Sequence, residues 1–187
     1  MLAYVFWHWP FRETEPDRYE SSLFDFHRSL AERKPDGFHE SYVFRLKETP
    51  WGSNDGLVYE DWYLVDDFNA LSLLNESAVT GVSRAPHDRV AQKADGGAGG
   101  VYRLRAGQPM LSRARHAVWF SKPRALPYDE FYRGIPSLAL QAGGGLWERQ
   151  MVLGPAAECC LLATEEIVVP RALETRVVTV KLAWLNA

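Results

Sequence analysis

Two histidines in apolar surroundings are the residues of this sequence with the clearest capacity for chemistry. His8 stands between two tryptophans, and His27 lies on the apolar stripe of a predicted helix. A histidine in such a place can act as a general base, because burial moves its pKa within reach of neutral pH. The alternative for each is a structural role, with the ring hydrogen-bonded inside the core. His87 and His116 lie in polar segments and are expected to be solvated.

Glu60 and Asp61 form a second candidate cluster, together with the Trp62 that follows them. A carboxylate within an otherwise apolar run is costly to bury unless it is paired. We therefore expect one of the two to meet Arg45, Arg103 or a histidine across a sheet. Such a pair is either a structural ion pair or a group that handles protons.

Other kinds of site lack their sequence signatures. No H-x-x-x-H pattern and no cysteine pair at ligand spacing occurs, so we expect no metal site. The glycines at 96–100 are not followed by the Lys and Ser or Thr of a phosphate loop, and no G-x-S-x-G nucleophile motif occurs. Cys159 and Cys160 are the only cysteines. Because they are adjacent, we expect two small buried hydrophobic side chains and no disulfide framework.

The composition is that of a globular protein rich in aromatic residues. Seven tryptophans, eight tyrosines and nine phenylalanines occur, so aromatic rings should dominate the interior or line a pocket. A net charge of −3 argues against nucleic acid or an anionic membrane as a partner. No run reaches the ~18 to 20 apolar residues of a membrane span, and no signal peptide is recognisable. We expect a cytoplasmic protein, and the sequence leaves a homo-oligomer open.

Alternating and helical patterns predict the order strand, helix, strand, strand, helix, strand in the first half of the chain. The predicted elements are a strand at 3–9, a helix from Pro16 to Arg33, strands at 38–47 and 57–65, a helix capped by Asp66, a short helix begun by Pro86, a flexible break at 95–100 and a strand at 100–105. The strands at 3–9 and 57–65 are apolar on both faces and should be covered on both sides.

The pattern then begins again. Ala117–Pro123 is a weaker copy of Tyr4–Pro10, with Ser121 where the first copy has His8. The predicted elements that follow are a strand to 121, a helix from Pro127 to about Leu140, strands at 146–153 and 156–164, a turn or stunted helix at 165–174 and a strand at 177–184. The order is that of a ferredoxin-like unit, and its repetition predicts an α+β protein of two such units, residues 1–107 and 114–187.

The first helix is similar to that of EthD-like proteins. The similar residues are Asp17-Arg18-Tyr19, Phe24-Asp25-Phe26-His27-Arg28-Ser29-Leu30 and Pro35-Asp36-Gly37. The resemblance covers about the first 45 residues and implies the dimeric α+β barrel superfamily, in which two ferredoxin-like sheets face each other around a cavity. It therefore implies that the tandem units close into an intrachain barrel. It also gives His27 a role in a site. Because members include cofactor-free monooxygenases, isomerases and proteins with no known reaction, the fold does not decide the function.

The functional hypothesis is a barrel cavity for a small, largely apolar molecule, with cofactor-independent monooxygenase or isomerase chemistry. His8 and His27 are the candidate catalytic residues, and no cofactor is expected. The candidate ligand-binding residues are Phe6, Trp9, Tyr42, Glu60, Asp61, Trp62, Trp119 and Ser121. The alternative is a non-catalytic structural or assembly protein whose barrel is filled by its own tryptophans.

Overall fold

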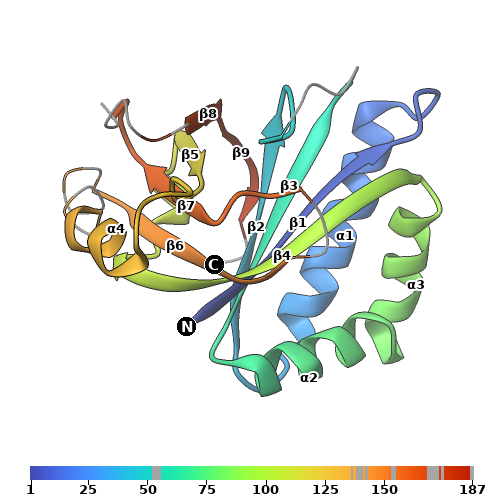
Figure 1. The fold of residues 1–187 in the computed structure, drawn as a ribbon. Helices are drawn as coiled ribbons and strands as arrows, with labels where there is room; N and C mark the ends of the chain where they lie inside the picture. The colour runs from blue at the N-terminus through green and yellow to red at the C-terminus, as the bar shows by residue number, and fades with distance from the viewer. Residues whose placement is uncertain are drawn as a thin grey trace.

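A computed structural model describes residues 1–51, 56–135, 137, 141, 143–152, 155–167, 173 and 175–185. Figure 1 shows α1, α2 and α3 covering the outer face of the strands β1 to β4, with α4 beside the strands of the second half. In chain order the elements are β1 (Leu2–Pro10), α1 (Pro16–Arg33), β2 (Phe38–Leu46), β3 (Val58–Val65), α2 (Phe68–Ala78), α3 (Gly81–Ala91), β4 (Ala94–Gly107), the 3-10 turn η1 (Leu111–Arg113), β5 (His116–Phe120), α4 (Tyr128–Gly134), β6 (Gly145–Val152), β7 (Cys159–Ala163), β8 (Thr175–Thr179) and β9 (Lys181–Leu185).

The sheet order confirms the predicted duplication. The described strands form one nine-stranded sheet in the order β8-β5-β7-β6-β4-β1-β3-β2-β9. The first unit contributes β4-β1-β3-β2 and the second β8-β5-β7-β6, so each unit places its fourth, first, third and second strands side by side. This is the ferredoxin-like arrangement. The two units join where β4 pairs antiparallel with β6.

The last two strands bring the sheet close to a closed barrel. β8 pairs with β5 at one edge of the sheet, and β9 pairs with β2 at the other. Only Val180 separates β8 from β9, and its N–H donates to the carbonyl of Arg115 at 3.0 Å. The predicted single strand at 177–184 is therefore divided at this residue. The barrel is therefore nearly closed, with β8 and β9 as the two edge strands of the sheet.

The strand β3 separates two interiors. All eight of its side chains are buried, which confirms that this segment is covered on both faces. Side chains alternate along a strand. Val58, Trp62 and Leu64 accordingly pack inside the barrel, and Tyr59, Tyr63 and Val65 pack beneath the helices.

The glycine run belongs to a strand, so the predicted flexible break at 95–100 was wrong. β4 passes through these glycines and pairs along its length with the aromatic strand β1. A Cβ at Gly97 would lie 2.5 Å from Cζ of Phe6, and one at Gly99 would lie 2.9 Å from the hydroxyl of Tyr4. The glycines are therefore needed for close packing, because only a residue without a side chain leaves room for these rings.

Two helix boundaries in the first half differ from the prediction. Asp67, not Asp66, caps α2, and its side chain accepts from the Ala70 N–H at 2.9 Å. Asp66 instead pairs with His39. Pro86 lies inside α3, five residues after the helix begins at Gly81. The start of α3 is held by tertiary contact, since a guanidinium nitrogen of Arg33 donates to the carbonyl of Thr80 at 2.7 Å.

The second half follows the prediction in its strands. β5, β6 and β7 lie within the predicted segments or one residue from them. Positions 136 and 138–140 of the predicted helix and most of the predicted turn at 165–174 lie outside the described residues. Cys160 packs inside the barrel and Cys159 beneath α4, so both are buried as predicted. None of the described helices has the length and apolar character needed to span a bilayer.

Candidate active site

A cavity of about 650 Å³ lies between the helices α1, α2 and α3 and the face of the sheet that these helices cover. Its walls are mostly apolar side chains from α1, α2, α3 and β4. These include Leu23, Phe26 and Leu30 of α1, Phe68, Leu71 and Leu74 of α2, Val90 of α3 and Val101 of β4. Polar side chains gather on the sheet side, namely Tyr4, His8, Tyr19, Asp61 and Tyr63. An apolar pocket with a few convergent polar groups is the usual form of a small-molecule site.

Asp61 is the centre of the polar group. Its Oδ2 atom lies 3.1 Å from Nε2 of His8 and 3.1 Å from Nε2 of His27. The Tyr63 hydroxyl donates to the same oxygen at 3.0 Å. The structure thus confirms that one of the two neighbouring carboxylates meets a histidine across the sheet, and it brings both candidate histidines to one atom. Arg45, which was another of the expected partners, binds Glu20 instead.

The hydrogen bonds at Nδ1 of His8 and His27 indicate which ring nitrogen carries the proton. The Tyr19 hydroxyl lies 2.6 Å from Nδ1 of His8, and the Ser41 hydroxyl lies 2.8 Å from Nδ1 of His27. If both hydroxyls donate, each neutral ring carries its proton on Nε2, which faces the anionic Asp61. We assign these tautomers because they let Nδ1 of each ring accept from a hydroxyl and turn the Nε2 proton toward the carboxylate of Asp61.

Electrostatics hold Asp61 as an anion and the nearby phenols as neutral donors. Burial acts to raise the pKa of Asp61, but its electrostatic interactions with His8 and His27 and the hydrogen bond with His27 outweigh burial and lower that pKa well below its usual range. Burial, followed by the charge of Asp61, raises the pKa of Tyr19 and of Tyr63. The negative charge is therefore concentrated on the carboxylate at neutral pH.

Two buried polar atoms in this group have no hydrogen-bond partner among the described residues. Oδ1 of Asp61 is one, because the hydrogen bonds of His27 and Tyr63 both go to Oδ2. Nε2 of His8 is the other, because its 3.1 Å contact with Asp61 lies off the direction of a hydrogen bond. Both residues belong to the pocket lining. A buried polar atom without a partner is unfavourable, so these atoms are suited to receive a polar group of a ligand.

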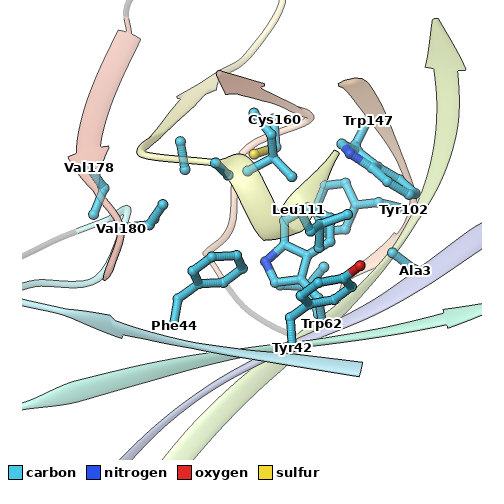
Figure 2. Packing of buried hydrophobic residues seen from close by; sticks show 14 of the residues in the cluster. Ala3, Tyr42, Phe44, Trp62, Tyr102, Leu111, Trp147, Cys160, Val178 and Val180 are labelled. Carbon is cyan, nitrogen blue, oxygen red and sulfur yellow. The ribbon is translucent and has the colours of Figure 1, made fainter. Parts of the chain in front are cut away.

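The barrel interior is filled by side chains around its tryptophans. Trp7, Trp62, Trp119 and Trp147 are at most 1% exposed. The rings of Trp7 and Trp119 meet at a centroid distance of 5.1 Å, and those of Trp62 and Trp147 at 5.3 Å. Figure 2 shows Trp62 and Phe44 on one side of this packed layer, facing Cys160 from the other half. The structure thus places the pocket outside the barrel, where the sequence had predicted a cavity within it.

Glu60 belongs to this filled interior and not to the pocket. Its two carboxyl oxygens accept hydrogen bonds from the indole N–H of Trp7 at 2.6 Å and of Trp62 at 2.7 Å. Burial raises the pKa of Glu60 to about 7, against the lowering effect of these two hydrogen bonds. The two neighbouring carboxylates, which the sequence suggested as one cluster, therefore lie on opposite faces of β3.

The remaining predicted ligand-binding residues divide in the same way. Phe6 lines the helix–sheet pocket. Tyr42, Trp62 and Trp119 pack in the barrel, and Trp9 is half-buried against Gly96 at the end of β1. Ser121 lies beyond the end of β5, where its hydroxyl accepts from the backbone N–H of Glu158 at 3.2 Å. The structure does not bring these last five residues together with His8.

Tyr19, Tyr63 and His87 are ring-bearing polar residues of the pocket that the sequence analysis did not identify as candidates. Tyr19 and Tyr63 contribute the hydroxyls that contact His8 and Asp61, and His87, expected to be solvated, is a half-buried part of the wall. The signal for Tyr63 was present, because it stands two residues after Asp61 and so shares its face of the strand. Within the described part of the chain, no group of three or more His, Cys, Asp or Glu side chains is arranged to hold a metal ion.

Three solved structures share this fold over nearly the whole chain. A proposed monooxygenase from Fusobacterium nucleatum subsp. nucleatum aligns with a TM-score of 0.66 and 10% identity, covering 99% of this chain and 93% of the other. A proposed monooxygenase from Lactobacillus acidophilus aligns with a TM-score of 0.65 and 8% identity, covering 98% and 95%. An anthrone oxidase-like protein aligns with a TM-score of 0.59 and 8% identity, covering 99% and 92%.

No protein-family model and no curated protein matches the chain. At such low identities the structural likeness establishes the fold, an α+β barrel, and no activity. It is consistent with the dimeric α+β barrel superfamily that the first helix suggested. The finer resemblance of that helix to EthD-like proteins stays a prediction.

Proposed function

We propose that the protein is an enzyme that removes a proton from a small, largely apolar molecule and oxidises it with O₂. The observation that carries the proposal is the buried group of His8, Asp61 and Tyr19 at the floor of an apolar pocket. A base beside an anion in a water-poor site is an arrangement suited to proton abstraction. The pocket lining carries no lysine or arginine, which favours a neutral substrate over an anionic one.

His8 is the proposed general base, and Tyr19 connects it to the substrate. In the assigned tautomer the free electron pair of His8 is on Nδ1, where it accepts from the Tyr19 hydroxyl. As the substrate gives its proton to the Tyr19 oxygen, that hydroxyl passes its own proton to Nδ1. The resulting imidazolium is stabilised by Asp61, which lies 3.1 Å from Nε2. The acceptor oxygen Oδ1 of Asp61 can bind a second polar hydrogen of the substrate.

His27 has a positioning role in this proposal. It is completely buried and is not part of the pocket lining, so it does not touch the substrate. Its contact with Asp61 and its hydrogen bond with Ser41 hold the carboxylate in place. Replacing His27 should therefore slow the reaction less than replacing His8.

The oxidation needs no electrons other than those of the substrate. In a molecule with an acidic CH₂ group beside a carbonyl or aromatic ring, loss of a proton leaves a delocalised carbanion that can reduce O₂. The balanced outcome is that the CH₂ group loses both hydrogens, one oxygen atom forms a new carbonyl, and the other leaves as water. The structural likeness to two proposed monooxygenases and an anthrone oxidase-like protein supports this choice over isomerisation, which would use the same base without O₂.

Anthrone is a suitable test substrate, because it is a neutral tricyclic molecule whose CH₂ group is flanked by two rings. We expect O₂ uptake together with formation of anthraquinone, with kcat reduced about 100-fold or more in His8→Asn. Tyr19→Phe should lower kcat with little change in KM. The control is His39→Gln, since His39 pairs with Asp66 away from the pocket. Equal rates in the wild-type protein, His8→Asn and the absence of protein would refute the proposal for this substrate.

The filled barrel favours a second candidate, a non-catalytic structural or assembly protein. In that case the helix–sheet pocket would still bind apolar molecules, but His8 would serve only to satisfy Asp61. Substitution of His8 would then lower the melting temperature and leave every turnover measurement unchanged.

A further inference from the structure

A second cavity, of about 1050 Å³, opens at one end of the barrel. The described residues around it come from the loop after β2, the end of β5, the segment before β7 and the start of β8. Its apolar walls include the rings of Trp51, Trp119 and Phe120. Small-molecule sites usually measure roughly 300–1,000 Å³, so this space is large enough for a ligand of two or more fused rings.

Every charged residue that lines this cavity is a cation. The four are Lys122, Arg124, Arg149 and Arg176. Two of these cations form ion pairs with carboxylates outside the lining: Glu158 lies 3.7 Å from Arg149, and Glu48 lies 3.2 Å from Arg176. Four positive charges against two negative ones leave the mouth of the barrel electropositive, although the whole chain carries a net charge of −3.

The wall also contains a buried donor without a partner. Trp119 is 1% exposed, and its indole Nε1 has no hydrogen-bond partner among the described residues. Of the other tryptophans in this cluster, Trp7 and Trp62 donate to Glu60, and Nε1 of Trp147, which is not part of the cavity lining, also has no partner among the described residues. The unmatched indole at the wall of this cavity is a second and independent indication of a ligand with an acceptor group.

We propose that this cavity binds an aromatic anion, a planar ring system with a carboxylate or sulfonate group. The rings would pack on Trp51 and Trp119, and the anionic group would lie among the arginines, whose planar guanidinium groups suit such oxyanions. The site differs in chemistry from the helix–sheet pocket, whose lining carries no cationic Lys or Arg, and it does not depend on the function proposed for that pocket.

A matched pair of fluorescent probes separates charge from shape. 8-Anilinonaphthalene-1-sulfonate and N-phenyl-1-naphthylamine share the same rings, and only the first carries an anionic group. Because the neutral probe can also enter the helix–sheet pocket, the two probes are compared in Leu71→Trp, in which that pocket is filled. We expect the sulfonate to bind this variant at least about tenfold more tightly than the neutral probe at low salt, because two or more charge-assisted contacts are available to it. The preference should decrease as salt is added.

Variants locate the bound sulfonate. The double variant Arg124→Gln, Arg176→Gln should weaken sulfonate binding about tenfold or more and leave the neutral probe unchanged. Arg28→Gln, Arg84→Gln removes the same charge from exposed positions on α1 and α3 and should change neither affinity. Leu71→Trp, which fills the helix–sheet pocket, should leave sulfonate binding intact. Equal affinities of the two probes, an unaffected cavity double variant, or loss of the sulfonate in Leu71→Trp would overturn the proposal.

Discussion

Replacing Glu60 by glutamine should remove a pH dependence that this buried carboxyl imposes on the stability of the protein. Glu60 is completely buried, and its hydrogen-bond partners among the described residues are the indole N–H groups of Trp7 and Trp62. Neutral donors of this kind do not offset the cost of burying a charge. The pKa is therefore raised by burial to about 7 from its ordinary value of 4.5.

The sign and size of the effect follow from proton linkage. Between pH 4.5 and about 7 the carboxyl is ionised in the unfolded chain and still protonated in the folded protein. Folding therefore takes up a proton, and the free energy of unfolding falls as pH rises, until it levels off above the folded pKa. At about 1.36 kcal/mol per pH unit, the displacement of the pKa corresponds to a loss of about 3 kcal/mol.

Urea unfolding of the wild-type protein and Glu60→Gln, measured from pH 5 to 8, tests this reasoning. The difference in unfolding free energy, wild type minus variant, should fall by about 1.4 kcal/mol per pH unit up to about pH 7 and stay constant above it. Contributions of groups that titrate alike in the wild-type protein and the variant cancel in the difference. The glutamine NH₂ facing an indole N–H adds only a constant offset. A difference that is flat or that rises with pH would show that Glu60 is not buried as described.

Three further substitutions test the helix face. Asp61→Asn should reduce the free energy of unfolding at pH 7 by about 3 to 5 kcal/mol in urea titration, because it removes one member of a buried charged group; a loss below about 1 kcal/mol would contradict its central place. Gly97→Ala should cost about 1 to 3 kcal/mol, because its Cβ would lie 2.5 Å from Cζ of Phe6, whereas Gly56→Ala, with no atom within 4 Å of its Cβ, should not destabilise. Leu71→Trp should weaken binding of N-phenyl-1-naphthylamine to the helix–sheet pocket about tenfold in fluorescence titration, and unchanged affinity would place that probe elsewhere.

Periodicity in the sequence was sufficient to predict most of the fold. The helix at 16–33 has one continuous apolar stripe, and the strand at 57–65 is apolar on both faces. Each pattern was therefore compatible with a single secondary-structure assignment. The glycines at 96–100 led to the wrong prediction of a flexible break, because a glycine-rich segment is flexible only where no other part of the protein packs against it. Here the rings of Tyr4 and Phe6 lie across Gly97 and Gly99, which is a property of two strands and is invisible in one.

The sequence was sufficient to predict which residues belong to the candidate site, but not where in the fold the site lies. His8, His27 and Asp61 were each candidates, but only the register of β1 against β3, which pairs Phe6 with Asp61, brings His8 to the carboxylate. Strand alternation alone could have separated Glu60 from Asp61. It could not have shown that the barrel side would be filled, since that depends on four tryptophans from β1, β3, β5 and β6 meeting in one layer.

The contrast between Glu60 and Asp61 shows what decides the charge of a buried carboxyl in this fold. The two are neighbours on β3 and equally buried, yet the pKa of Glu60 is raised and that of Asp61 is lowered. The difference lies in their partners, which are neutral indoles in the barrel and ionisable imidazoles beneath the helices. A fully ionised carboxylate is therefore found at neutral pH on the helix face, whereas Glu60 in the barrel is only partly ionised. The proposed proton abstraction needs such a charge to stabilise the imidazolium it creates, so we assign the proposed chemistry to the pocket outside the barrel.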